Sequence, residues 1–388
     1  MINSTREEQR LSRMTRAVAL STLACLAVSW RLWLSTRLYP LTPAWGLLPP
    51  FPFPSDVLVL ACLVGMLLGV VAVPRSRPLL AGVVVLFAVL FAQDQSRLWP
   101  SFYELFFCLL LLLVAPRPAS EVTASRTLMG LRFVMAAVYF WGGALKLNPF
   151  FAAEFSWFVR PLTDLLPFSV PFMPAIAVGA AVFEMLFAIG LLTRRFRAIA
   201  IWEALLMHAA ILVCIGPLRG DWNDAAWVWS LTMAARLWIL FHAAPPFDVG
   251  AMFAGPPRSR TVPALAVVFV GVLPILNTAN RWDSAVSFNV YTGNVGSATV
   301  LMDPAAVSRL PAEVARHVHQ DGEWAVLQIN DWAMAEFNAG AYPERRVFRR
   351  VCSQLCGWLD DPSARIVIVN KAGWFTPKAT RVHQCGEL

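Results

Sequence analysis

Charged residues are scarce in this chain: Asp, Glu, Lys and Arg together make up 14% of its 388 residues. An ordinary soluble domain carries about 25% of them. Hydrophobic residues reach 58%, and the mean hydropathy is +0.59. This balance excludes an ordinary soluble globule, and it predicts a polytopic membrane protein whose first partner is the lipid bilayer.

Several sequence motifs that mark catalytic, phosphate-binding or metal sites are also absent. The sequence has no HExxH, no paired Cys-x-x-Cys, no glycine-rich phosphate loop and no GxSxG. His317 and His319 fall in a stretch with helical spacing, where residues two apart point in different directions. We therefore expect no metal site. The net charge is +8, but the arginines cluster between apolar runs, so we also expect no nucleic-acid partner.

Nine apolar runs are candidates to cross the bilayer as helices. They are residues 14–34, 57–73, 79–92, 102–115, 127–151, 172–193, 198–216, 225–242 and 262–276. The first run lacks a small-residue cleavage site and ends in Trp30, Arg31 and Trp33. It is therefore expected to be a retained span and not a removed signal peptide.

Arginines give the expected orientation. Every second loop between the runs carries at least two arginines close to a run, and the turn RRFR at 194–197 is the strongest case. By the positive-inside rule these loops are cytoplasmic. We expect a cytoplasmic tail (1–13), a bundle of about nine transmembrane helices (14–279) and an extracytoplasmic domain (280–388), in a bacterial inner membrane.

The composition changes at about Asn280 to that of a small soluble domain. ATVLM, AVLQI and ARIVIV have strand character, whereas RLPAEVARHVHQ and PERRVFRRVCSQLCGWL have helical spacing. An α+β domain is therefore expected. A disulfide within one helix is geometrically poor, so we expect Cys385 to pair with either Cys352 or Cys356.

The run 127–151 places two cations in an apolar segment. Arg132 and Lys146 are 14 residues apart, so on one helix they share a face at opposite depths, together with Tyr139 and Gly143. Such a face cannot point at lipid, and Gly143 allows a backbone or a flat ligand to approach closely. This helix is expected inside the bundle.

Other polar groups lie near mid-membrane, namely Glu184, His208 and Arg236, and we expect Glu184 to pair with Arg236. Such a pair can simply fix helix register, and His208 can be an ordinary buried histidine. A lysine in an apolar pocket can be neutral near pH 7, which makes Lys146 a candidate base. The alternative is that Lys146 and Arg132 extend to the membrane surfaces as anchors.

With these residues in view, a family resemblance can be stated. Arg132, the stretch GGALKLN with Lys146, and Glu184 in FEMLFAIGLLTRRFR resemble the DoxX/DoxD-type membrane fold, which includes MauE-like proteins. The segment YFWGGALKLNPFF is similar to the HTTM domain of vitamin K-dependent γ-carboxylases. The likeness covers about residues 56–295, with its core at 56–244.

The resemblance implies a site for a quinone-like or lipid-like ligand near the outer face. In the carboxylases the matching lysine deprotonates a quinol cofactor, which implies Lys146 as base, with Glu184 and His208 beside it. Arg132, Tyr139, Gly143 and Arg236 are then candidate ligand contacts. Leu145 stands where the carboxylases carry a second lysine, and their large lumenal region is much reduced here.

Two functions follow as hypotheses. The first is a quinone-linked membrane oxidoreductase or a γ-carboxylase-like enzyme. The second is a non-catalytic accessory or assembly protein whose C-terminal domain docks a periplasmic or membrane protein. A transporter would favour inverted repeats and broken helices at matching positions, and the sequence shows neither.

Overall fold

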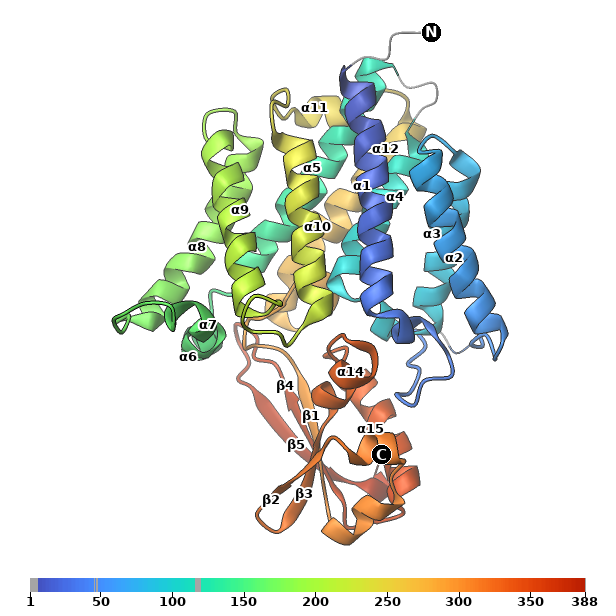
Figure 1. Cartoon of the computed structure of the whole chain (residues 1–388), viewed down its shortest axis with the longest axis vertical. Coiled ribbons are helices and arrows are strands. Elements are labelled where there is room, and N and C mark those ends of the chain that lie inside the picture. Colours follow the sequence, from blue (N-terminus) through green and yellow to red (C-terminus); the bar gives the residue numbers. More distant parts are fainter. Residues whose placement is uncertain (1–5, 45, 47, 116–119, 388) are drawn as a thin grey trace.

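A computed structural model describes residues 6–44, 46, 48–115 and 120–387. Helices form a bundle, and a small antiparallel sheet with its own helices lies beneath one end of it (Figure 1). The predicted combination of a helical bundle and a C-terminal α+β part is therefore confirmed. We call the end of the bundle next to the sheet the domain end, and the opposite end, where α1 begins, the amino end.

Each of the nine apolar runs falls on a helix or a helical segment. These are α1 (Arg6–Val28), α2 (Ser55–Ala72), α3 (Arg77–Gln93), α4 (Pro100–Val114), α5 (Glu121–Ala144), α8 (Met173–Leu192), α9 (Arg197–Cys214), α10 (Asp224–Phe241) and α12 (Pro257–Ala266) with its continuation to Ala279. Within the described residues, six are long and apolar enough to cross a membrane: α1, α2, α5, α8, α9 and Pro257–Ala279. The expected number of nine crossings stays a prediction.

Helix α5 is the centre of the bundle. In its apolar window 83% of the residues are buried, whereas the other five candidate spans reach at most 44%. Helices α8, α1 and α4 pack against it. The prediction that this helix lies inside the bundle is confirmed.

The two ends of α5 are set by local chemistry. At its start, the Ser120 and Thr123 side chains cap each other's backbone N–H groups. The expected continuous helix to Phe151 is wrong, because α5 ends at Ala144 and α6 (Pro149–Phe158) begins after a turn. Pro149 cannot continue a helix, and the Asn148 side chain accepts hydrogen bonds from the first N–H groups of α6.

The C-terminal part contains a five-stranded antiparallel sheet. Its strands are β1 (Ser297–Met302), β2 (Val318–Asp321), β3 (Trp324–Gln328), β4 (Arg365–Asn370) and β5 (Ala379–Gln384), in the order β2-β3-β1-β4-β5. Helices α14 (Ile329–Phe337) and α15 (Arg345–Leu359) pack on it. The shorter helices are α7 (Arg160–Thr163), α11 (Val249–Met252) and α13 (Ala312–Ala315).

Three predicted strands and one predicted helix of this domain are confirmed as β1, β3, β4 and α15. The expected helix over 309–320 is wrong in its second half, where His319 lies in β2. Gly322 adopts a positive φ of 59°, so Asp321 pairs with Trp324 across a two-residue turn. That hairpin draws the preceding residues into the sheet.

A disulfide joins Cys356 in α15 to Cys385, just beyond β5. This confirms one of the two expected pairings. Cys352 stays a free, buried thiol, and burial raises its pKa to about 12. The disulfide thus closes the end of the sheet onto α15.

The domain is fastened to the bundle by polar contacts. The Arg346 guanidinium pairs with Asp283 and donates to the Gln95 side chain at 2.7 Å. The Asn338 amide donates to the Val28 carbonyl at the end of α1 and to the Asp224 carboxylate at the start of α10. These contacts tie both helix ends to one face of the domain.

Candidate functional site

Lys146 and Glu184 meet at the domain end of the bundle. The Nζ atom of Lys146, in the turn after α5, lies 2.5 Å from Oε2 of Glu184 in α8. Their side chains are only 16% and 13% exposed. The Phe151 ring lies 5.9 Å from the amine. Because little water reaches this pair, each charge is stabilised mainly by the other charge and not by hydration.

Two glycines make this pair possible. A Cβ atom on Gly142 would lie 2.7 Å from Oε1 of Glu184, and one on Gly143 would lie 2.7 Å from the Ala181 carbonyl oxygen. The Glu184 oxygen is the far end of a flexible side chain and could move, whereas the Ala181 oxygen belongs to the α8 backbone. The small residues therefore let the α8 backbone approach α5, and the expected room beside Gly143 is filled by α8 itself.

A second polar chain crosses the bundle deeper inside. The Tyr139 hydroxyl and Nε2 of His208 share a hydrogen bond of 2.7 Å, and Nδ1 of His208 shares another of 2.7 Å with the Ser230 hydroxyl. All three residues are buried. Because a neutral imidazole has one donor and one acceptor, the direction of this chain reverses when the tautomer changes.

The expected pair of Glu184 with Arg236 is wrong. Arg236 in α10 instead pairs with Glu104 in α4, with Nη1 at 2.5 Å from Oε1 and both side chains fully buried. Glu184 pairs with Lys146, as described above. Burying either carboxylate without a counter-ion would cost free energy of desolvation. Each therefore pairs with the cation that the packing of the helices places next to it. The Cys108 thiol also donates to Glu104, at 3.2 Å.

Arg132 lies away from these groups, towards the amino end, as its 14-residue separation from Lys146 predicted. Its guanidinium is fully buried and donates to the carbonyl oxygens of Leu240 and Pro245. Glu7 lies 4.0 Å away. Arg132 therefore holds the C-terminal end of α10, and the structure does not bring it together with Lys146, His208 or Arg236.

A cavity of about 440 Å³ lies where the bundle meets the C-terminal domain. Its wall includes the aromatic side chains of Trp99, Trp157, Trp222, Tyr291 and Phe348 among small and polar residues, and Glu154 and Lys378 add one charge of each sign. Its volume is within the range of ligand pockets. Lys146 is not among its lining residues. The Asn148 amide links the two places, because it donates both to Leu145 beside the lysine and to Thr292 in the cavity wall.

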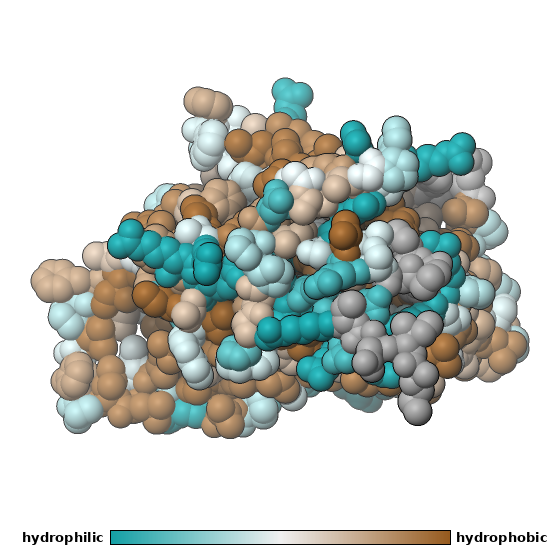
Figure 2. All heavy atoms as spheres, turned by 90° about the horizontal axis from the view of Figure 1, so that it is seen from above, coloured by the Kyte–Doolittle hydropathy of each residue, from teal (hydrophilic) through white to brown (hydrophobic). Residues whose placement is uncertain are grey.

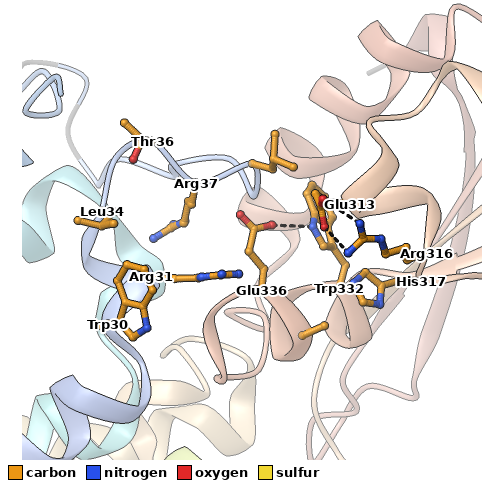
Figure 3. A pocket seen from close by; sticks show the side chains of 12 residues that line it. Trp30, Arg31, Leu34, Thr36, Arg37, Glu313, Arg316, His317, Trp332 and Glu336 are labelled. Carbon is orange, nitrogen blue, oxygen red and sulfur yellow. Dashed lines mark hydrogen bonds and ion pairs between the residues drawn. The ribbon is translucent and has the colours of Figure 1, made fainter. Parts of the chain in front are cut away.

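A second, larger cleft of about 560 Å³ opens between the segment after α1 and the C-terminal domain (Figure 3). Its wall carries Arg31, Arg37, Arg316 and His317 together with Glu313 and Glu336. The chemistry of this cleft is separate from that of Lys146.

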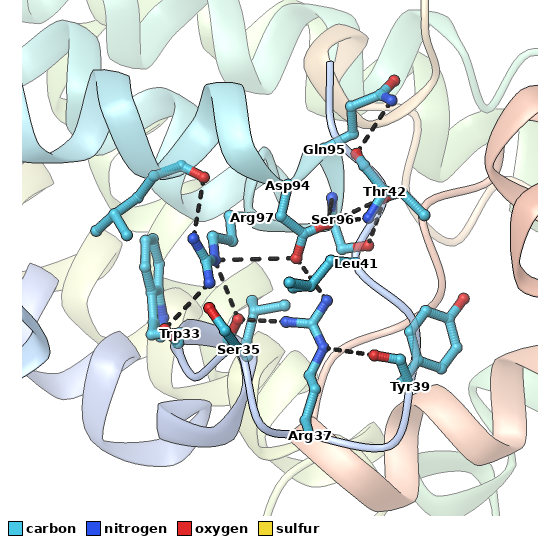
Figure 4. Close-up of polar contacts among 12 residues, drawn as sticks. Trp33, Ser35, Arg37, Tyr39, Leu41, Thr42, Asp94, Gln95, Ser96 and Arg97 are labelled. Atoms are coloured by element: carbon cyan, nitrogen blue, oxygen red, sulfur yellow. Dashed lines mark hydrogen bonds and ion pairs between the residues drawn. The ribbon is translucent and has the colours of Figure 1, made fainter. Parts of the chain in front are cut away.

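Buried charges fix the wall of that cleft (Figure 4). Asp94 accepts from Arg37 at 2.5 Å, from Thr42, and from the Ser96 backbone, with Arg97 3.8 Å away. Burial alone would raise the pKa of Asp94, but the two arginines outweigh it and hold the pKa below its ordinary value. The network anchors the segment after α1 to the end of α3.

The sequence interpretation missed three of these features. Glu104 is the single acidic residue of its apolar run, a signal that points to a buried cation as partner. Ser230 carried no such signal, because a lone serine in an apolar run is common. The cavity lined by Trp99 and Tyr291 joins residues that are distant in sequence.

Comparison with known proteins adds no identification. No family model matches the sequence, and the searches of curated proteins and of solved structures also find no match.

Proposed function

We propose that the chain is an integral membrane protein that binds a quinone-like or lipid-like ligand at the domain end, with Lys146 and Glu184 as its proton-transfer pair. The observation that carries this proposal is the 2.5 Å contact between Lys146 Nζ and Glu184 Oε2. The contact is largely shielded from water, and Asn148 links the segment that carries Lys146 to the wall of the aromatic cavity.

Exposed apolar side chains support the placement in a membrane. On α8 and α9 they include Leu186, Trp202 and Leu206, which are 58%, 65% and 71% exposed. A water-soluble monomer rarely presents so much contiguous apolar surface. Lipid covers such faces without cost, because the hydrocarbon is as apolar as the side chains.

Arginines support the orientation. They gather at the amino end, at Arg6, Arg13, Arg16, Arg75, Arg77, Arg194, Arg195, Arg258 and Arg260. Figure 2, which looks onto this end, has hydrophilic side chains among apolar ones. By the positive-inside rule the amino end faces the cytoplasm and the C-terminal domain lies outside, as expected for a bacterial inner membrane.

The aromatic cavity fits a flat apolar molecule. Trp99, Trp157, Trp222 and Tyr291 offer ring faces and edges, and Asn289 and Lys378 offer polar contacts. When bound, a quinol would supply an acidic hydroxyl group and two electrons. The aromatic wall would orient such a ring and exclude water from it.

The Lys146 and Glu184 pair has the chemistry of a base. In its charged form the proton is on Nζ of Lys146, and transfer to Oε2 of Glu184 leaves a neutral amine and a neutral acid. The neutral amine can then accept a proton from a bound hydroxyl group, and Glu184 must release its own proton before the ammonium again faces a carboxylate.

Tyr139 in α5, His208 in α9 and Ser230 in α10 form a supporting relay in the bundle. Tyr139 lies in α5, and Lys146 lies in the turn that follows this helix. Because the histidine has two tautomers, this chain can move a proton across the bundle without a change of charge. The proposed reaction class is that of a quinone-linked oxidoreductase or a γ-carboxylase-like enzyme, as the sequence resemblance implies.

The test compares two variants of the purified full chain in detergent. Lys146→Met should lose co-purifying quinone or turnover at least about tenfold, because a charge-assisted contact is worth about 1.5–3 kcal/mol. Arg160→Gln removes an exposed cation from the same end of the bundle and should retain the wild-type level. Mass spectrometry of extracted apolar molecules measures the ligand. If the Lys146→Met variant kept the ligand content and activity of the wild type, Lys146 would serve only as an anchor.

An accessory role is the second candidate, and exposed aromatics on the C-terminal domain favour it. Trp374 and Phe375, at the tip of the β4–β5 hairpin, are 70% and 90% exposed. A docking protein would need such a surface. In that case Trp374→Ser with Phe375→Ser should abolish function in cells, whereas Lys146→Met should leave it intact.

A further inference from the structure

The cleft between the segment after α1 and the C-terminal domain has walls of both charge signs (Figure 3). One wall carries Trp30, Arg31 and Arg37, and the facing wall carries Glu313, Arg316 and Glu336. Which of these charges is free to bind a ligand follows from their partners within the protein.

Three of the charges are already neutralised. The Arg37 guanidinium pairs with Asp94 at 2.5 Å and also donates to the carbonyl oxygens of Leu32 and Tyr39. Arg316 and Glu313 pair with each other at 2.7 Å. None of these three charges needs a further partner.

Two charges remain. Arg31 is exposed, and among the described residues its guanidinium has no hydrogen-bond or ion-pair partner, only the Trp30 ring at 5.4 Å. Glu336 accepts hydrogen bonds from neutral groups alone, the Tyr39 N–H and Trp332 Nε1. In the described part of the chain no cation lies within ion-pair distance of it. Besides His317, which also lines it, the cleft thus presents one unpaired guanidinium and one carboxylate without a cationic partner.

The position of the cleft narrows the ligand class. Trp30 and Arg31 directly follow α1 at its domain end, and Trp30 is 48% exposed. If the bundle lies in a membrane as proposed, this is the level of the lipid head groups, where tryptophan is enriched. Leu34 and Leu38 add apolar lining beside the charges.

We propose that this cleft binds a zwitterionic phosphoethanolamine group, with Arg31 on the phosphate and Glu336 on the ammonium. Guanidinium groups bind phosphate in a forked geometry, and a primary ammonium donates hydrogen bonds to a carboxylate. The source is either the head group of phosphatidylethanolamine or a free phosphoethanolamine ester.

Other head groups can pair with only one of the two charges, Arg31 or Glu336. Phosphatidylglycerol offers a phosphate to Arg31 but no cation to Glu336. Phosphatidylcholine carries a quaternary ammonium, which has no N–H to donate to the carboxylate. The pairing of charges therefore predicts a preference for the primary amine, and not simply for negative lipid.

Native mass spectrometry of the detergent-solubilised full chain tests this preference. Dioleoyl phosphatidylethanolamine, phosphatidylglycerol and phosphatidylcholine are titrated in turn, and the first should bind about tenfold more tightly than the others, the factor that one charge-assisted contact gives. Competition by free O-phosphoethanolamine would identify a soluble ligand, and binding of the lipid without such competition would identify the lipid. Equal affinity for all three lipids would overturn the proposal.

Three variants locate the site. Arg31→Gln should weaken phosphatidylethanolamine binding about tenfold. Glu336→Gln should remove the preference over phosphatidylglycerol while binding of phosphatidylglycerol persists, a result that misfolding cannot produce. Arg349→Gln, an exposed arginine on α15, is the control and should change nothing. Unchanged lipid preference in both cleft variants would contradict the proposal, and their quinone content reports separately on the Lys146 site.

Discussion

Arg236 and Glu104 form an ion pair from which water is fully excluded. Nη1 of Arg236 lies 2.5 Å from Oε1 of Glu104, and both side chains are 0% exposed. Within the described residues, Nη2 of the arginine and Oε2 of the glutamate have no hydrogen-bond partner, and the further contacts of the pair are with neutral groups, the Thr232 carbonyl and the Cys108 thiol. Each of these two charges therefore depends on the other.

Removing one member of this pair should be costly. Arg236→Leu leaves the Glu104 carboxylate buried without a cation, and the expected loss is about 3–5 kcal/mol of unfolding free energy. Thermal unfolding in detergent, followed by circular dichroism, measures it. The double variant Glu104→Leu with Arg236→Leu should be closer to wild type than either single variant. If the double variant is the least stable of the three, the pair is not coupled as the geometry requires.

The close approach of α5 and α8 should depend on Gly142. A Cβ atom there would lie 2.7 Å from Oε1 of Glu184, so Gly142→Ala must displace this carboxylate and weaken its contact with Lys146. Because that oxygen is the far end of a flexible side chain, the direct steric cost is small, and the main expected effects are a weaker contact with Lys146 and reduced ligand retention. Gly179→Ala in α8 is the matched control, since nothing lies within 4 Å of its Cβ position. An equal response of the two variants would rule out the steric explanation.

The disulfide between Cys356 and Cys385 should stabilise the C-terminal domain. Cys385→Ser is expected to lower its stability by about 2–4 kcal/mol, because the open chain gains conformational freedom when unfolded. Protease resistance of the domain and thermal unfolding both report this. Cys62→Ser changes an exposed free thiol and should be neutral. A reductant should reproduce the Cys385→Ser effect in the wild type and have no further effect on the variant.

Lys371 should make the stability of the domain depend on pH. Burial lowers its pKa to about 8, although Glu344 and Asp283 act in the opposite direction. Between about pH 8 and its ordinary pKa of 10.5, the unfolded chain binds more protons than the folded one, so this residue makes stability rise with pH across that window. Lys371→Met should remove the rise. The measurement is the difference between the pH profiles of wild type and variant, and parallel profiles would contradict the expectation.

The local elements were largely predictable from the sequence. Runs such as 57–73 and 172–193 are apolar over a bilayer's length, and hydrogen bonding within the segment makes any such run a helix. The spacing of Arg132 and Lys146 predicted that the two residues lie far apart along the bundle, because the rise per residue of a helix is constant. The helical pattern of α15 is equally a local property, whereas only the structure decided which of Cys352 and Cys356 pairs with Cys385.

The polar partnerships were not predictable in this way. Glu184 had two cations at plausible depths, and sequence gives depth but not which helices are neighbours. The glycines at 142 and 143 allow α8 to pack closely against α5, so Glu184 pairs with Lys146. Arg236 pairs instead with Glu104. The strand β2 was missed for a related reason, since its residues have helical spacing and only pairing with β3 makes them extended.

The amino-acid sequence by itself determined that the chain forms apolar helices followed by a small α+β domain, and that cations lie among those helices. Only the tertiary structure decided which carboxylate neutralises each cation and which charges stay free in the cleft beside Arg31. The physical reason is range: backbone hydrogen bonding and burial act along neighbouring residues, whereas an ion pair forms only where packing brings two distant segments within a few ångströms.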